Sequence, residues 1–323
     1  MNKSMVLKNP VKWTVTFFLI IAMQSFTLAE GDNDKVGSVA FKFLNIETDA
    51  RTAALGGTSA QASGPGAMFS NPAGLSSTSS MGLSAGLSQW LVETNITSFG
   101  FALPMAGGVV GLGVVNVDYG DMMMAGWGEV LPDVVGLQAN QGKFTAGDLS
   151  LQVSYGKSLT DKFSIGGSAK MISQSIDDVD ISGTAFDIGM QFNTGYSGIQ
   201  MGAVISNFGP DVESQAPDDA GYAGFPSMSL PMTFSFGVIG EPMPGLNAGL
   251  NVLKQADMAQ QYIVNAEYNV SIASLRFSYN INDDQAPMSM GGGVNVAGAD
   301  IGVSMTSHDA LDSVMRISVG YSF

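Results

Sequence analysis

The chain has 323 residues, of which 45% are hydrophobic and only 13% are charged, about half of the roughly 25% found in an average soluble domain. Its 13 basic and 28 acidic residues give a formal net charge of −15, which argues against nucleic acid as a partner, and its 41 glycines follow no collagen-like period. The sequence contains no cysteine, which speaks against disulfide bonds and a lipoprotein anchor.

Residues 1–29 predict a cleaved secretory signal peptide. Lys3, Lys8 and Lys12 form a basic start, residues 13–26 are apolar, and Ala29 is a small residue at the expected cut. The apolar stretch is shorter than the roughly 18 residues that suggest a spanning helix, which favours a cleaved peptide. An uncleaved anchor helix is the alternative. An acidic, exported chain without cysteine indicates a bacterial envelope protein.

Residues 30–80 form a distinct segment that is too short and too rich in glycine to be a separate domain. Residues 49–55 predict a short helix that ends at Gly56 and Gly57. Asn71 and Pro72 predict the start of a turn. This segment is either a tether in the periplasm or a plug inside the structure that follows.

From residue 81 onward, apolar and polar residues alternate with a period of two, which predicts strands with one apolar and one polar face. The polar face consists mostly of Gly, Ser, Asn and Gln, which suits a crowded lumen better than the charged surface of a soluble sandwich. We therefore predict an all-β fold: a 14-stranded antiparallel transmembrane β-barrel over residues 81–323, with residues 30–80 as an N-terminal hatch or plug segment. The predicted strands are 81–90, 94–103, 108–118, 146–158, 163–175, 182–194, 198–207, 230–238, 246–254, 261–270, 272–281, 288–296, 299–307 and 314–323.

The connections between these strands sort by length. With the C-terminus on the periplasmic side, the turns on that side have seven residues or fewer, whereas the connections on the other side include the long stretches 119–145 and 208–229. Short periplasmic turns and longer external loops are typical of outer-membrane barrels.

The last strand also carries a predicted assembly signal. Its apolar face ends in an aromatic residue at the chain end, and it is similar to the terminal strand that the barrel-insertion machinery recognises. The alternative is that this aromatic residue only marks the membrane interface. The residues of the predicted signal are Met315, Ile317, Val319, Tyr321 and Phe323.

Two short motifs in residues 41–75 carry a family resemblance. They read Ala-Arg-x-Ala-x-x-Gly-Gly and Asn-Pro-Ala-Gly-Leu, and their key residues are Arg51, Gly56, Gly57, Asn71, Pro72, Ala73 and Gly74. Together with fourteen strands and a terminal Phe, they resemble the PorV/PorQ family, which is similar in turn to the FadL-type outer-membrane fatty-acid transporters.

The resemblance implies a location in the outer membrane of a Gram-negative-type bacterium and a role in type IX secretion. In that role the barrel binds the C-terminal signal domain of cargo and carries it from the translocon to the surface attachment complex. The alternative is a FadL-like channel for hydrophobic solutes, for which we expect a gap in the wall near the third strand. A purely structural barrel is a third possibility.

Catalysis is not predicted. His308 is the single histidine, and no Gly-x-Ser-x-Gly turn accompanies it, so neither a hydrolase nor a metal site built from His and Cys is expected, and no cofactor is implied. Acidic loops are read as solvated, with Ca²⁺ binding as the alternative. These loops carry Asp177, Asp178 and Asp180; Asp211, Glu213, Asp218 and Asp219; and Asp283 and Asp284.

Two further groups of residues are candidates for contacts. An apolar partner or ligand surface is predicted on the long external loops, because methionine-rich patches adapt to many partners. The alternative is that these loops fold over the barrel mouth and bury the side chains themselves. The residues are Met122, Met123, Met124, Trp127, Tyr222 and Phe225. Charges on polar faces are expected to pair with one another or with the hatch inside the lumen. These charges are Lys170, Asp187, Glu267, Arg276 and Arg316.

Overall fold

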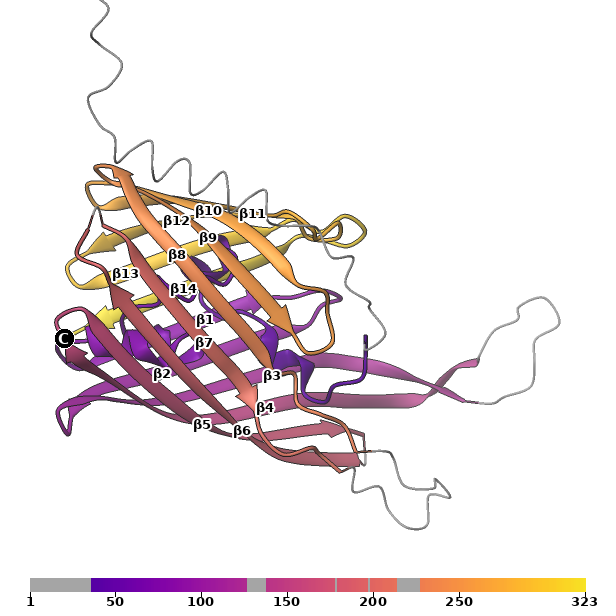
Figure 1. Cartoon of the computed structure of the whole chain (residues 1–323). Coiled ribbons are helices and arrows are strands. Elements are labelled where there is room, and N and C mark those ends of the chain that lie inside the picture. Colours follow the sequence, from indigo (N-terminus) through magenta and orange to yellow (C-terminus); the bar gives the residue numbers. More distant parts are fainter. Residues whose placement is uncertain (1–35, 127–137, 178, 197, 214–226) are drawn as a thin grey trace, which may run out of the picture.

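A computed structural model describes residues 36–126, 138–177, 179–196, 198–213 and 227–323. Fourteen antiparallel strands form one closed barrel in sequence order, which confirms the predicted fold class (Figure 1). The strands are β1 (Gly82–Gln89), β2 (Asn95–Met105), β3 (Gly108–Gly126), β4 (Gln138–Thr160), β5 (Phe163–Ile176), β6 (Val179–Asn193), β7 (Gln200–Phe208), β8 (Thr233–Met243), β9 (Leu246–Gln255), β10 (Gln261–Val270), β11 (Ala273–Asn280), β12 (Met288–Val296), β13 (Ala299–Thr306) and β14 (Val314–Ser322).

The ring closes where the first strand meets the last. Gly82 lies opposite Ser322 and Gln89 lies opposite Met315, in continuous register. A closed ring has no unpaired strand edge, which matters because the hydrocarbon of a bilayer offers no hydrogen bonds to the backbone. We call the end with the C-terminus and the short turns the turn end, and the opposite end, from which the β3–β4 hairpin extends, the mouth end (Figure 1).

Side chains alternate between the two faces of the wall, as predicted. On β14, Met315 and Ile317 are 56% and 51% exposed, whereas Arg316 and Ser318 are 4% and 9% exposed. The same alternation runs along the whole of β11. The apolar face therefore points outward and the polar face points into the lumen, which is the arrangement that suits lipid outside.

Strands β3 and β4 extend farther than the sequence predicts. The stretch 119–145 was expected to be a loop, but β3 continues to Gly126 and β4 begins at Gln138. The ladder between them shifts register after Asp118 and again after Met123. Beyond the bilayer a hairpin needs no continuous apolar face, so this part of the sequence lacks the alternation that would have indicated strands.

Residues 38–80, which we call the inner segment, lie inside the ring (Figure 1). Helix α2 packs against β11 to β14, the 3₁₀ helix η2 against β1 to β3, and η3 against β3 to β6. The remaining strands are contacted by Arg51 and by residues 57–60, so the inner segment touches every strand of the barrel. Its helices are η1 (Lys42–Asn45), α2 (Ala50–Ala54), η2 (Pro65–Phe69) and η3 (Pro72–Ser77).

Within the described residues, no helix combines the length and the apolar character needed to cross a bilayer.

Candidate functional site: a filled lumen with an apolar mouth

Local sequence sets the first part of the inner segment. The side chain of Asp49 caps α2 by accepting the Thr52 N–H at 2.8 Å. Gly56 and Gly57 follow the helix with φ of +71° and +75°, a left-handed conformation that favours glycine. The predicted helix and its glycine stop are confirmed. This short helix directs Arg51 toward β10.

Arg51 binds a carboxylate on the wall through two parallel hydrogen bonds. Its Nε and Nη2 atoms donate to Glu267 at 3.0 and 2.8 Å, and its Nη1 atom donates to the carbonyl of Gln61 at 3.0 Å. Arg276 of β11 donates to the same carboxylate at 2.8 Å. Glu267 is buried, so the two guanidinium groups offset the cost of removing its charge from water.

The turn at Asn71 is the second fixed point. Its side chain accepts the Ala73 N–H at 3.1 Å and donates to the carbonyls of Ser59 at 2.9 Å and Met190 of β6 at 3.2 Å. Asn71 is fully buried, and Pro72 opens η3, so the predicted turn is confirmed. One amide side chain therefore shapes the turn, ties it to the rest of the inner segment and fastens it to the wall.

A row of glycines on the inner wall receives this turn. A Cβ added at Gly156 would lie 2.5 Å from the Pro72 carbonyl oxygen, one at Gly189 would overlap Asn71 Oδ1, and one at Gly202 would lie 2.5 Å from the Ser59 carbonyl oxygen. Main chain of the inner segment therefore rests directly on main chain of the wall. In register, the row comprises Gly156, Gly166 and Gly189 across β4 to β6, then Gly202 and Gly237 across β7 and β8.

Lys170 and Asp187 form a buried ion pair in the lumen. Their charged atoms are 2.9 Å apart, and Lys170 also donates to the side chain of Asn207 at 2.7 Å. Asn207 has φ of +58° and lies where the register between β6 and β7 shifts. Its own side chain donates to Asn45 of the inner segment at 3.0 Å. This bulge thus links the ion pair to η1.

Arg316 is held without a direct carboxylate bond. Its Nε atom donates to the backbone carbonyl of Glu47 at 2.9 Å, its Nη1 atom donates to Thr306 at 3.0 Å, and its guanidinium stacks 5.2 Å from the centre of the Trp90 ring. The carboxyl of Glu47 lies in the inner segment. Burial, with Asp49 nearby, raises the pKa of Glu47 from 4.5 to about 7.

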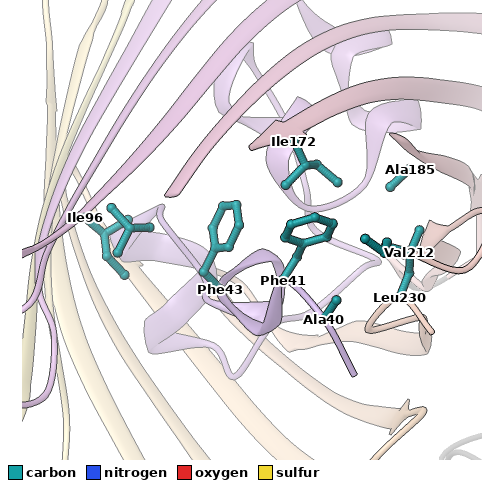
Figure 2. Close-up of a cluster of buried hydrophobic side chains, with 9 residues drawn as sticks. Ala40, Phe41, Phe43, Ile96, Ile172, Ala185, Val212 and Leu230 are labelled. Carbon is teal, nitrogen blue, oxygen red and sulfur yellow. The ribbon is translucent and has the colours of Figure 1, made fainter. Parts of the chain in front are cut away.

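The mouth end of the lumen holds the larger of two buried apolar clusters found among the described residues; the other consists of Met68, Leu75, Ala102 and Val109. Phe41 and Phe43 of the inner segment pack there against inward-facing residues of the wall and of the connection between β7 and β8 (Figure 2). We call this group the mouth cluster: Ala40, Phe41, Phe43, Ile96, Val117, Ile172, Ala185, Val212 and Leu230, with Leu44, Ile46, Trp90, Val115, Tyr119, Ile181 and Met228 packed around it.

Phe41 has an unusual backbone within this cluster. Its φ of +50° and ψ of +42° are left-handed, a conformation that is costly for a bulky residue. Its side chain is 1% exposed, so packing in the mouth cluster holds the strained backbone in place. Residues 41–46 are thus tied to the wall by apolar packing and a few polar contacts.

Two cavities lie beside the inner segment. One of about 230 Å³ is located at the turn end between the inner segment and β1, β13 and β14, and its lining includes Asp49, Arg51 and Asp300. The other, of about 20 Å³, is lined by Phe43, Ile46 and other side chains on the side of the mouth cluster that faces the turn end. The second has room for about one water molecule.

The remaining predicted residues are scattered. The five residues of the predicted assembly signal lie on the outward face of β14 and at the chain end, where the rings of Tyr321 and Phe323 meet edge to face. Met122 is half-buried in β3, which continues through Met123 and Met124. The other predicted surface residues, Trp127, Tyr222 and Phe225, lie outside the described residues, as do residues 1–29, so this surface and the signal peptide stay predictions.

His308 has a local structural contact. Its Nδ1 atom accepts the N–H groups of Ala310 and Leu311 at 3.2 and 3.1 Å, which closes the turn before β14. In the part of the chain that the structure describes, no group of three or more His, Asp or Glu side chains is placed to hold a metal ion.

Two features of the site were not predicted from the sequence. The mouth cluster was missed because its wall residues occupy inward-facing positions on strands whose other inward-facing residues are mostly polar. These positions were therefore expected to be polar as well. The glycine row was missed because it appears only when strands are aligned in register. The recurrence of inward glycines on five successive strands was the available signal.

Neither a family model nor a curated protein sequence matches this chain. Among solved structures, it is similar to the toluene transporter TbuX of Ralstonia pickettii, with a TM-score of 0.64, 14% identity and coverage of 87% of this chain and 100% of that chain. It is also similar to the toluene transporter TodX of Pseudomonas putida, with a TM-score of 0.61, 13% identity and coverage of 86% and 98%. The chain thus shares the fold of these two transporters, and a likeness specific to the PorV/PorQ family is not among these findings.

Proposed function

We propose that the protein is an outer-membrane channel for hydrophobic solutes. The mouth cluster carries this proposal, because it places Phe41, Phe43 and apolar wall residues at the mouth end of a lumen whose middle is lined mostly by small polar residues and paired ions. A second buried apolar group, Met68, Leu75, Ala102 and Val109, lies nearer the turn end. Burial of apolar surface contributes about 25 cal/mol per Å², so the mouth cluster offers an apolar solute a binding surface once part of the inner segment moves aside. The shared fold with two toluene transporters supports the same reading.

The unbroken wall and the inner segment together limit the routes that a solute can take through the barrel. Strands β2 and β3 pair without a break from Asn95 opposite Asp118 to Met105 opposite Gly108. The expected gap beside the third strand is therefore absent here, which counts against a lateral route through the wall. The inner segment lies across the lumen. Passage therefore requires displacement of part of the inner segment.

Residues 40–46 are the part best suited to move. Lys42 pairs with Asp257 at 2.5 Å; the lysine side chain is 45% exposed, although Asp257 is only 4% exposed. Water therefore reaches the lysine side of this pair, which lowers the cost of separating it. The strained backbone of Phe41 also favours release. Residues 49–77, in contrast, are fixed by the buried carboxylate of Glu267 and by the glycine row.

Uptake by intact cells tests this proposal. The full chain is expressed in the outer membrane of a bacterium that lacks related channels, and entry of labelled toluene is followed over time. We expect faster entry than in cells without the protein, and loss of the gain with Phe43→Ser. A matched control is Phe99→Ser, which changes an exposed residue on the outward face of β2. Equal toluene entry with and without the protein would reject the channel.

Type IX secretion is the second candidate. Its specific support is the β3–β4 hairpin, which extends beyond the barrel at the mouth end and offers a surface for a protein partner (Figure 1). Pull-down from detergent with the C-terminal signal domain of cargo tests it. Failure to enrich the signal domain, together with normal secretion in a deletion strain, would remove this candidate.

Both candidates place the barrel in the outer membrane of a Gram-negative-type bacterium after removal of residues 1–29. In either case its partners are outer-membrane lipid and the barrel-insertion machinery. Membrane fractionation and N-terminal sequencing of the mature protein test the location and the cut. Recovery in the inner membrane, or with Met1 retained, would contradict this placement.

A further inference from the structure

Asp148 is a buried carboxylate in the mouth end of the lumen; the side chains of Tyr119 and Gln174 lie beside it, and its Oδ1 atom has no partner at hydrogen-bond distance among the described residues. Asp148 faces inward from β4 and is 2% exposed. The hydroxyl of Tyr119 donates to its other oxygen, Oδ2, at 2.5 Å. A buried carboxylate in this state carries a large desolvation cost unless something else binds it.

The surroundings of Asp148 belong to the mouth cluster. Its register partner on β3 is Val117, and Tyr119 packs against the same cluster. Its register partner on β5 is Gln174, and the next inward residue of β4, Ser150, lies opposite Ile172. The free oxygen is therefore a single acidic point within the apolar site of the proposed function.

The cations that lie toward the mouth end already have partners among the described residues. Lys170 binds Asp187 and Asn207, Arg316 binds the Glu47 carbonyl and Thr306, and Lys42 and Lys143 pair with Asp257 and Asp121. From residue 30 onward, the sequence outside the described residues contains a single Lys or Arg, namely Lys35. The loops near the mouth therefore bring no other cation to Asp148.

Charge around the mouth also favours a cation. Besides Asp121, which pairs with Lys143, ten exposed or half-exposed acidic side chains occupy the connections and strand ends there, where the described basic residues are Lys42, Lys143 and Lys254. Such a field attracts cations and repels anions before they reach the lumen. The acidic residues are Glu93, Asp118, Asp177, Asp180, Asp211, Glu213, Asp283, Asp284, Asp309 and Asp312.

We propose that, once residues 40–46 are displaced, Asp148 binds the ammonium group of an amphipathic amine whose apolar part packs against the wall residues of the mouth cluster. The amine supplies a charge-assisted hydrogen bond to Oδ1, while Tyr119 holds Oδ2 and so acts as a positioning residue. The substrate class is a primary amine with an alkyl or aryl tail. This inference rests on the proposed function, because it names the solute that the apolar mouth prefers.

Binding of three probes of equal chain length tests the inference. The full chain is placed in nanodiscs of uncharged phosphatidylcholine, and octylamine, octanol and octanoate are titrated at pH 7 by calorimetry. We expect octylamine to bind at least about tenfold more tightly than octanol, and octanoate to bind most weakly. Asp148→Asn should lower the octylamine affinity to that of octanol. Equal octylamine affinity in the wild-type and Asp148→Asn proteins would overturn the assignment.

Further variants keep the test independent of folding. Tyr119→Phe retains the ring and should reduce the preference for octylamine only in part. Asp309→Asn, a matched change of an exposed acid, should leave the preference intact. If Lys35→Gln destabilises the protein as much as Asp148→Asn and the two effects are not additive, Asp148 is the partner of Lys35 and the inference fails.

The two proposals fail in different ways. Octanol binding without preference for octylamine removes the amine site and leaves the hydrophobic channel. Tight octylamine binding that depends on Asp148, without toluene entry into cells, removes the toluene-conducting channel and leaves the amine site.

Discussion

Gly166 of β5 and Pro72 of the inner segment meet backbone to backbone. A Cβ added at Gly166 would lie 2.5 Å from the Pro72 carbonyl oxygen and would overlap the carbonyl carbon beside it. The fit between the inner segment and the wall therefore depends on the absence of a side chain at this position.

Gly166→Ala should loosen the inner segment. The added methyl meets backbone that has no freedom to turn aside, and overpacking of this kind costs about 1–3 kcal/mol. We expect faster hydrogen exchange at residues 71–75 and a lower temperature for the heat-dependent gel shift of the barrel. Gly292→Ala is the control, because its nearest neighbour is at 3.4 Å, an ordinary contact distance. Unchanged exchange in Gly166→Ala would contradict the close contact.

Arg51→Met should open a leak for ions. The change removes two hydrogen bonds to Glu267, although Arg276 still neutralises that carboxylate. The loss in stability should stay below the roughly 3–5 kcal/mol of a fully stranded buried charge. Planar-bilayer conductance should rise relative to the wild-type protein and to Lys162→Met, which changes an exposed lysine at the turn end. A conductance equal to that of Lys162→Met would show that Arg51 does not hold the lumen closed.

Docking of the inner segment should weaken as the pH rises. The pKa of Glu47 is about 7 in the folded protein, above its ordinary value of 4.5, so between these values the folded state binds a proton that the undocked segment releases. The benefit is complete below pH 4.5 and is lost as the pH approaches and passes 7. Thermal midpoints at pH 5 and pH 8 should differ less in Glu47→Gln than in the wild type. The same difference in both proteins would show that other groups cause it.

Deletion of Phe323 should impair assembly more than stability. Its side chain is 63% exposed and makes one edge contact with Tyr321, so little packing is lost from the finished barrel. We expect less barrel in the membrane after pulse labelling, but a nearly unchanged unfolding temperature for the fraction that assembles. Leu311→Ala, a change of an exposed loop residue, should show neither effect. Normal membrane yield without Phe323 would contradict the predicted assembly signal.

The sequence predicted those parts of the structure that short-range rules control. The alternation on β14, the cap at Asp49 and the turn at Asn71 each depend on residues a few positions apart, and each is confirmed. The β3–β4 hairpin extends beyond the bilayer, where no lipid imposes an alternation of apolar and polar residues. The alternation rule therefore missed these strands, and the prediction of a loop was wrong.

The alternation of apolar and polar residues did not predict contacts between residues that lie far apart in the sequence. The place of Asp148 in the mouth depends on Tyr119, which the sequence assigned to a loop, and on the register with Val117. The glycine row likewise depends on alignment across five strands. Such relations are set by pairing in space, and spacing along the chain does not report them.

The seam between β1 and β14 imposes an order of events on biogenesis. Gly82 pairs with Ser322, so the cylinder has no complete circumference until β14 is delivered. Residues 38–80 precede β1 and touch all fourteen strands, so they have to be enclosed while the sheet is still an open, curling ribbon. A nascent chain stalled before β14 would therefore present two naked edges and an uncovered interior at once, which makes it a natural substrate for periplasmic chaperones and proteases.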